Sequence, residues 1–295
     1  MKSSWTHVSA WGGWPGAAAA ALALALPAGS ALAQSAVDLK ARHDTLKEAL
    51  QKSLFRRPVV LDSESSASDP HGDVYAVVAQ PFDRVGNALQ RAEQWCSVLT
   101  LQPNVKRCTA EGNAALQVAI TRRFDHPVKD AYQVDFKYRV SAADAGYLSV
   151  QMAADAGPLG TRNYKLGLEA VPIDAGHTFI HMSYSYSSGL AARLATDAYL
   201  ATSGRDKVGF SIVGSDAAGK PTLVNGVRGV AERNTMRYFL AIEAVLKTQS
   251  LPPAQQEDAR YREWFTATER YPRQLKEEMD VNQYVAMKKQ ESQSQ

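Results

Sequence analysis

The segment YQVDFKYRV, residues 132–140, alternates apolar and polar side chains along its whole length. Three later segments alternate in the same way: YLSVQMA at 147–153, YKLGLEA at 164–170 and TFIHMSYSYS at 178–187. A period of two residues is typical of antiparallel strands that turn one face to a core and the other to water. Because a slip of one residue would expose every apolar side chain, each apolar set must face a common interior.

The pattern changes after Gly229, and up to Gln249 no Gly or Pro interrupts a run that predicts one long helix. The apolar side chains of this run spread around more than one face, so we expect the helix to be covered on both sides. The sequence therefore predicts an α+β fold in which a curved antiparallel sheet grips a long helix and forms a cup.

Shorter elements surround this centre. A mature N-terminal helix is expected at 37–55, a short strand at 59–61, a polar loop at 63–71 and a strand at 73–80. Two short helices at 82–99 and two strands at 105–124 follow. A helix at 190–202 and a hairpin within 207–225 separate the last clear strand from the long helix. The tail is expected to add a helix that begins at the Pro252-Pro253 pair and carries Trp264 and Phe265, and a last helix at 274–287.

The first 33 residues have the features of a secretory signal peptide. Lys2 precedes an Ala/Leu run at 17–26, and Ala31-Leu32-Ala33 offers a small-x-small cleavage site. The run is too short to span a bilayer, and an uncleaved Ala-rich tail is the alternative. We therefore predict a signal peptide (1–33), an N-terminal helix (34–58), a ligand-binding domain (59–249), a helical extension (250–289) and a disordered tail (290–295), exported to the periplasm.

The charge of the chain is close to neutral. The 295 residues carry a formal charge of +3, and removal of Lys2 with the signal peptide leaves +2. Nucleic-acid binding requires a concentrated basic surface, so it is not expected. No later segment is long and apolar enough to cross a membrane.

Cys96 and Cys108 lie in one short segment. In an oxidising compartment they would close a small loop, worth roughly 2–3 kcal/mol in the chain-entropy model, and we predict this disulfide. Two buried free thiols are the alternative. A zinc site is poorly supported because no histidine lies near them.

The order of these elements resembles the helix-grip superfamily of StAR-related lipid-transfer domains, polyketide cyclases and birch-pollen-allergen-like proteins. The resemblance covers residues 59–249 and rests on the strand at 74–80, the helix pair at 82–99 with Trp95, the strands up to Ser187 and the long helix. It implies a tunnel between sheet and helix that binds a hydrophobic molecule. The chain departs from the simplest members by the inserted helix and hairpin at 190–225, and it lacks the glycine-rich loop of the allergen branch.

No nucleophile motif, metal-ligand set or phosphate-binding loop is present, so neither catalytic residues nor a cofactor or metal are predicted. His177 and His181 are four residues apart on a predicted strand, about 13 Å, too far to share one metal ion. They are interpreted as surface or edge residues. Asp135, Arg139 and Glu169 are expected on the outer face of the sheet.

Two arginines and a set of cup-facing side chains are the candidate ligand-binding residues. Arg233 and Arg237 would reach a carboxylate or phosphate head at the mouth of the cup, or else form a solvated or tail-packing face. The others offer apolar area with occasional polar tips, and ordinary core packing is the alternative for each. They are Tyr75, Phe136, Tyr138, Tyr164, Met182, Tyr184, Tyr186 and Phe239.

The leading hypothesis is a periplasmic carrier or sensor that binds a lipid or other hydrophobic small molecule without converting it. A cyclase- or dehydratase-like enzyme could use the same cavity through general acid–base groups. A third hypothesis is an envelope interaction protein whose cavity is filled by its own side chains. Transient membrane contact is an open alternative, for which Trp264 and Phe265 are the candidate patch.

Overall fold

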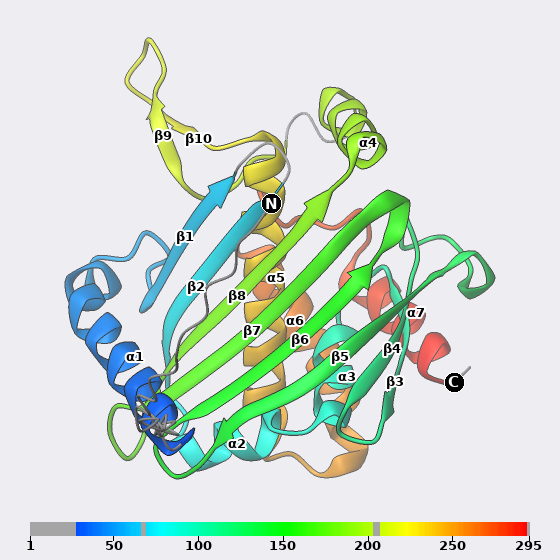
Figure 1. Cartoon of the computed structure of the whole chain (residues 1–295). Coiled ribbons are helices and arrows are strands. Elements are labelled where there is room, and N and C mark those ends of the chain that lie inside the picture. Colours follow the sequence, from blue (N-terminus) through cyan, green and yellow to red (C-terminus); the bar gives the residue numbers. More distant parts are fainter. Residues whose placement is uncertain (1–27, 66–68, 203–206, 294–295) are drawn as a thin grey trace, which may run out of the picture.

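The computed structural model describes residues 28–65, 69–202 and 207–293. Within these residues one antiparallel sheet has eight strands in the order β1-β2-β8-β7-β6-β5-β4-β3 (Figure 1). The α+β class expected from the sequence is confirmed. The strands are β1 (Val59–Ser65), β2 (Pro70–Val78), β3 (Val105–Glu111), β4 (Ala115–Ile120), β5 (Tyr132–Ala143), β6 (Leu148–Ala156), β7 (Thr161–Pro172) and β8 (Thr178–Ser188).

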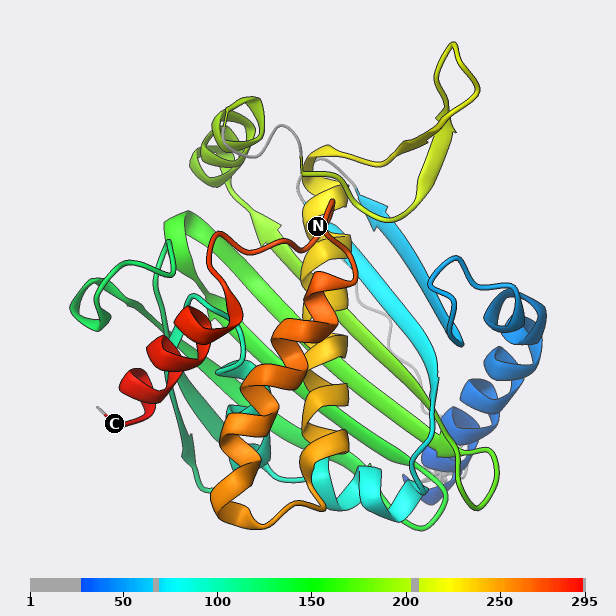
Figure 2. The same ribbon diagram turned by 180° about the vertical axis from the view of Figure 1, so that it is seen from behind.

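The long helix α5 (Gly226–Thr248) crosses the concave face of the sheet and packs against β1, β2 and β8. Helix α6 (Pro253–Glu269) lies on its opposite side (Figure 2). Helices α2 (Phe82–Leu89) and α3 (Ala92–Leu99) also contact α5. The helix is therefore covered on both sides, which explains its apolar residues on more than one face.

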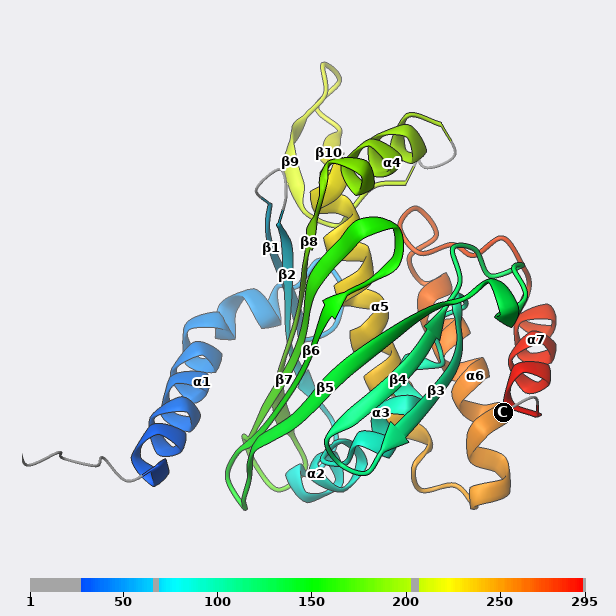
Figure 3. The same ribbon diagram turned by 45° about the vertical axis from the view of Figure 1, so that its right-hand side comes forward.

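Helix α1 (Ala28–Gln51) packs on the convex face, so that Figure 3 shows the layers α1, sheet, α5 and α6 in turn. It starts at Ala28 and so runs through the predicted cleavage position after Ala33. The rest of the predicted signal peptide, residues 1–27, lies outside the described residues. The predicted polar loop at 63–71 is shorter, because β1 continues to Ser65 and β2 begins at Pro70.

The strands bury alternate residues, as their period predicts. In β8, Ile180, Met182 and Tyr184 are buried toward α5, while His181 and Ser183 are partly exposed on the convex face. The predicted disulfide is present: Cys96 and Cys108 are joined at 2.00 Å and tie α3 to β3. Among the described residues, no helix combines the length and the apolar character that a membrane span requires.

The C-terminal segment is more ordered than predicted. Helix α7 begins at Val281, later than expected, and runs to Gln293, so the disordered tail predicted from Gln290 is helical at 290–293. The cause is a buried ionic cluster. Glu291 accepts hydrogen bonds from Lys106 Nζ at 2.6 Å and Lys288 Nζ at 2.9 Å, and both ammonium groups are almost fully buried. Without this carboxylate two positive charges would lie unpaired in the interior.

We therefore expect Glu291→Gln to lower the free energy of unfolding by about 3 kcal/mol, because it leaves buried ammonium groups without an opposite charge. Urea denaturation at neutral pH measures the change. Glu278→Gln is the matched control: that carboxylate is exposed and lies 3.6 Å from an exposed Arg123, so its loss should change stability by less than about 0.5 kcal/mol. Equal effects of the two substitutions would contradict the structural role of Glu291.

Candidate functional site

An aromatic cluster lies on the concave side, where β7 begins and β8 ends. Tyr164 stacks on Tyr186 with ring centroids 5.5 Å apart, and Tyr184 lies 5.8 Å from Tyr186. Helix α5 contributes Tyr238, 5.4 Å from Tyr184, and β5 contributes Phe136, 6.4 Å from Tyr164. We call these five side chains the tyrosine cluster. Tyr238 was not predicted, because a helix that is apolar on several faces does not reveal which residues face the sheet.

The hydroxyl groups of the cluster differ in their partners. Tyr164 donates to Thr161 Oγ1 at 2.8 Å, and the Asn234 side chain lies near the Tyr184 hydroxyl. Among the described residues, the hydroxyls of Tyr186 and Tyr238 have no hydrogen-bond partner. Burial raises the pKa of Tyr186 to about 12 and that of Tyr184 well above its usual value. The hydroxyls therefore stay neutral and can donate hydrogen bonds.

The cup is filled below this cluster. Met182 and Phe239, both predicted to line a ligand, are 0% exposed, as is Leu168 beside them in the core. A side chain with no accessible surface has no room for even a water molecule next to it. In contrast, Tyr164 and Tyr238 are only partly buried. The tyrosine cluster is thus the part of the predicted lining that solvent can reach.

Tyr138 lies deep in the core rather than at the open end. Its hydroxyl is 3.4 Å from the Leu89 carbonyl oxygen, which also accepts the Trp95 indole N–H at 2.8 Å. Burial raises the Tyr138 pKa. The side chain joins β5 to the α2–α3 pair.

The prediction that Tyr75 faces the cup is wrong. Val74 and Ala76 occupy the concave positions of β2, so Tyr75 lies on the convex face, stacked on His181 at 4.4 Å. Both faces of this strand are apolar in sequence, and alternation alone does not show which one meets the core.

The two candidate arginines have different surroundings. Arg233 is buried, donates to the carbonyl oxygens of Lys207 and Val208 at 3.2 and 3.3 Å, and its charge acts on Tyr186. Arg237 instead pairs with Glu277 at 2.8 Å, so it holds the tail and does not face the cup. This outcome matches the tail-packing alternative for Arg237.

Glu232 has a structural role that the sequence did not reveal. Its side chain is fully buried and accepts hydrogen bonds from Ser63 Oγ and from the backbone N–H groups of Phe210 and Ser211. It therefore fastens β1 and the segment after residue 207 to the start of α5, beside the tyrosine cluster. Arg228, one helical turn earlier, lies 3.9 Å from the Glu232 carboxylate.

A second group of polar residues lies on the convex face under α1. His181 Nε2 is 2.7 Å from Asp73 Oδ1 and its Nδ1 is 3.0 Å from Glu169 Oε2. His71 contacts the other oxygen of Asp73 at 2.7 Å, and the Tyr147 hydroxyl donates to Glu169. We call these five residues the ionic chain. Within the described residues, no group of three or more His, Cys, Asp or Glu side chains could hold a metal ion.

Burial alone would lower the pKa of His181, but hydrogen bonds and attraction to Asp73 and Glu169 raise it to about 9. Burial likewise opposes the ionised form of Asp73, yet hydrogen bonds from His181 and His71 lower its pKa to about 2. The pKa of Glu169 is lowered by its hydrogen bond to His181. The chain therefore holds an imidazolium between two carboxylates across the neutral pH range.

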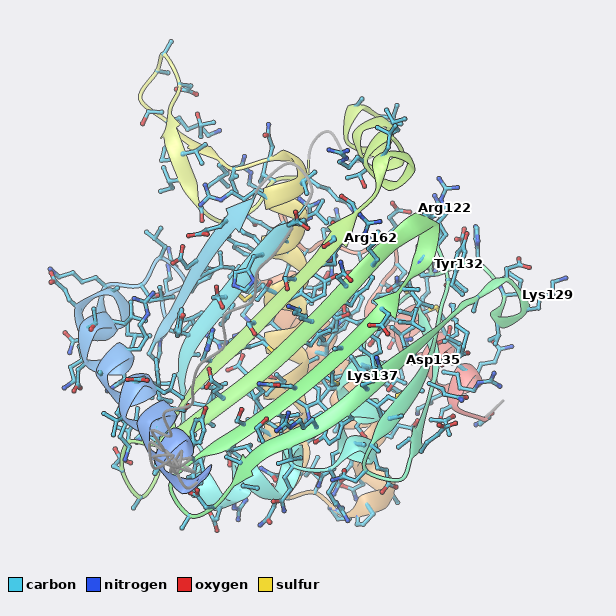
Figure 4. The ribbon with its side chains drawn as sticks, viewed as in Figure 1. Arg122, Lys129, Tyr132, Asp135, Lys137 and Arg162 are labelled. Atoms are coloured by element: carbon cyan, nitrogen blue, oxygen red, sulfur yellow. A yellow bond between two sulfur atoms is a disulfide. The ribbon has the colours of Figure 1, made fainter. Side chains whose placement is uncertain are left out.

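The interpretation of His181 as a surface or edge residue is wrong, because strand pairing places it between β2 and β7. Its ring is also covered by Tyr75, over which Arg42 of α1 lies at 4.8 Å. His177, in contrast, is exposed in a turn with Asp174, as expected. The remaining convex face is solvated: Figure 4 shows Asp135, Lys137 and Arg162 projecting from it.

No family model matches this chain, and no curated protein matches it. Three solved structures are similar in part. Norcoclaurine synthase from Thalictrum flavum is 17% identical over 48% of this chain and 89% of that chain, with a TM-score of 0.32. A conserved protein from Geobacillus kaustophilus is 12% identical over 46% and 85%, with a TM-score of 0.32.

A conserved protein of unknown function from Enterococcus faecalis is 9% identical over 85% of this chain and 98% of that chain, with a TM-score of 0.34. Similarity at this level carries no argument about function. The helix-grip arrangement rests on the observed strand order and on the position of α5 against the sheet.

The ionic chain predicts how stability depends on pH. Because its pKa is raised from 6.5 to about 9 on folding, His181 contributes up to roughly 3 kcal/mol to the free energy of unfolding. This contribution is complete below pH 6.5 and is lost as pH rises through about 9. The contribution of Asp73 is complete above 3.8 and is lost as pH falls through about 2. Urea denaturation between pH 6 and 9.5 should show the first loss, and His181→Gln should remove it. His177→Gln is the control and should leave the fall in the free energy of unfolding with rising pH unchanged. If His177→Gln removes this fall as completely as His181→Gln does, the assignment to His181 is wrong.

Proposed function

We propose that this protein is an exported binding protein that holds a small hydrophobic or amphipathic molecule, such as a lipid, at the tyrosine cluster and does not convert it. The observation that carries the proposal is the pair of Tyr186 and Tyr238 hydroxyls, which have no protein partner among the described residues although both rings lie in an aromatic cluster. A polar group in such surroundings gains by meeting a ligand atom.

The chemistry of the cluster favours a ligand of mixed polarity. Ring faces of Tyr164, Tyr184 and Tyr186 offer contact to an apolar or aromatic body. The neutral hydroxyls donate hydrogen bonds to an oxygen of the ligand. The nearby positive charge of Arg233 favours a ligand whose polar end is negative or strongly accepting.

The packed interior sets the depth of binding. Because Met182 and Phe239 leave no free space beside them, the polar end and the first part of the ligand would be held at the tyrosine cluster. Entry of a longer chain would require these core side chains to move.

Export to the periplasm is part of the proposal. It is supported by the signal-like segment at 1–33 and by the Cys96–Cys108 disulfide, since disulfides persist in oxidising compartments.

The test uses anilinonaphthalene sulfonate, a fluorescent probe with an aromatic body and an anionic group. The wild-type protein should bind the probe, and the double variant Tyr186→Phe/Tyr238→Phe should bind it about 5- to 30-fold more weakly, because two hydrogen bonds are lost. Tyr132→Phe is the control, since this side chain is 40% exposed at the start of β5 and contacts no ring of the tyrosine cluster, and it should have no effect.

Organic extraction of protein purified from its own host, followed by mass spectrometry, should release the natural ligand. Probe affinity unchanged in the double variant, together with no extracted molecule, would contradict the proposal. A chemically altered ligand after incubation would instead favour the cyclase-like enzyme.

A further inference from the structure

Large apolar side chains are exposed at one end of the molecule. Helix α4 (Leu190–Ala201) carries Leu190 and Leu194, 67% and 61% exposed, and strand β9 (Ile212–Ser215) carries Ile212 and Val213, 49% and 53% exposed. Leu159, 41% exposed, lies in the short 3₁₀ turn η2 (Pro158–Gly160), which packs against α4. Exposed apolar groups gathered in one region of a protein mark an interaction surface.

The apolar side of α4 faces away from the protein. Leu190, Leu194, Ala198 and Ala201 are exposed and recur at intervals of three or four residues, so they follow one side of the helix. The helix contacts η2, β8 and α5, and Arg193 and Thr196, which lie between the exposed positions in sequence, are partly buried. A helix that turns an apolar stripe to solvent is typical of helices that lie in a lipid–water interface.

The same region has an excess of positive charge. Among the described residues between 189 and 228, the chain has Arg193, Lys207, Lys220 and Arg228 against Asp197 and Asp216. Arg162 is exposed at the adjoining start of β7 (Figure 4). Basic residues beside an apolar surface attract anionic lipid headgroups.

Position favours a flat partner. Helix α4 and the hairpin of β9 with β10 (Pro221–Leu223) project from the same end of the sheet as two separate tips (Figures 1 and 2). A bilayer can meet both tips at once, whereas a protein partner would need two matching hollows. The tyrosine cluster lies at this end, since β8 passes from Tyr186 into α4 within four residues.

We infer that α4, η2 and the β9–β10 hairpin form a surface that docks on an anionic lipid bilayer, with the tyrosine cluster turned toward it. The inference deepens the proposed function, on which it rests, by naming the bilayer as the place where the ligand is collected or delivered. Trp264 and Phe265, the candidate membrane-contact residues considered from the sequence, are packed in the core at 0% and 1% exposure. They therefore do not form that contact.

The test is co-sedimentation of the full chain with vesicles of equimolar phosphatidylglycerol and phosphatidylcholine. The protein should bind these vesicles, bind pure phosphatidylcholine vesicles less, and lose affinity as salt rises. Leu190→Ser/Leu194→Ser should weaken binding about tenfold or more, because two interfacial leucines are lost. The matched control is Val37→Ser/Leu54→Ser, which removes two equally exposed apolar side chains, 58% and 77%, at the other side of the molecule, and it should bind as the wild type does.

Equal binding by both double variants, or no binding by the wild type, would overturn the inference. So would a dimer in analytical ultracentrifugation that Leu190→Ser/Leu194→Ser converts to a monomer, because the patch would then be covered by a second copy. The two proposals fail separately: the leucine variant should keep the affinity for soluble anilinonaphthalene sulfonate, and Tyr186→Phe/Tyr238→Phe should keep the affinity for vesicles.

Discussion

The burial of α5 in the concave face of the sheet is the constraint on which the rest of the structure depends. Met236, Phe239 and Leu240 of this helix are fully buried, so α5 is not stable in water without the sheet on one side and α6 on the other. The sheet has the same requirement, because Ile180, Met182 and Tyr184 of β8 are buried on the face toward the helix. Each element removes the apolar surface of the other from water.

Buried charges then attach the outer segments to this centre. Glu232 binds β1 and the segment after residue 207, Glu291 holds α7 through Lys106 and Lys288, and the ionic chain around His181 lies beneath α1. Each such group is costly unless paired, so its pairing fixes one arrangement of the segment that carries the partner. Apolar contacts alone would permit these segments to shift.

The candidate site lies where the two kinds of packing meet. At the deep end of the cup, aliphatic and aromatic side chains fill the interior. At the other end, tyrosines replace them, and each brings a hydroxyl into a region with few partners. Helix α4 and the β9–β10 hairpin project beside that end (Figure 1). The tyrosine hydroxyls and the exposed apolar side chains of α4, η2 and β9 thus lie at the same end of the molecule.

Period-two alternation determined the strands, the α+β class and the inward direction of Tyr164, Tyr184 and Tyr186, because the pleat fixes side-chain direction once one face must be buried. It could not place Tyr75, since both faces of β2 are apolar, or find Tyr238 on a helix buried all round.

Only the tertiary structure joined His181 to Asp73, 108 residues away, and placed Glu291 beside two lysines. The pairing of distant segments depends on the whole set of contacts, and no local pattern in one sequence records it.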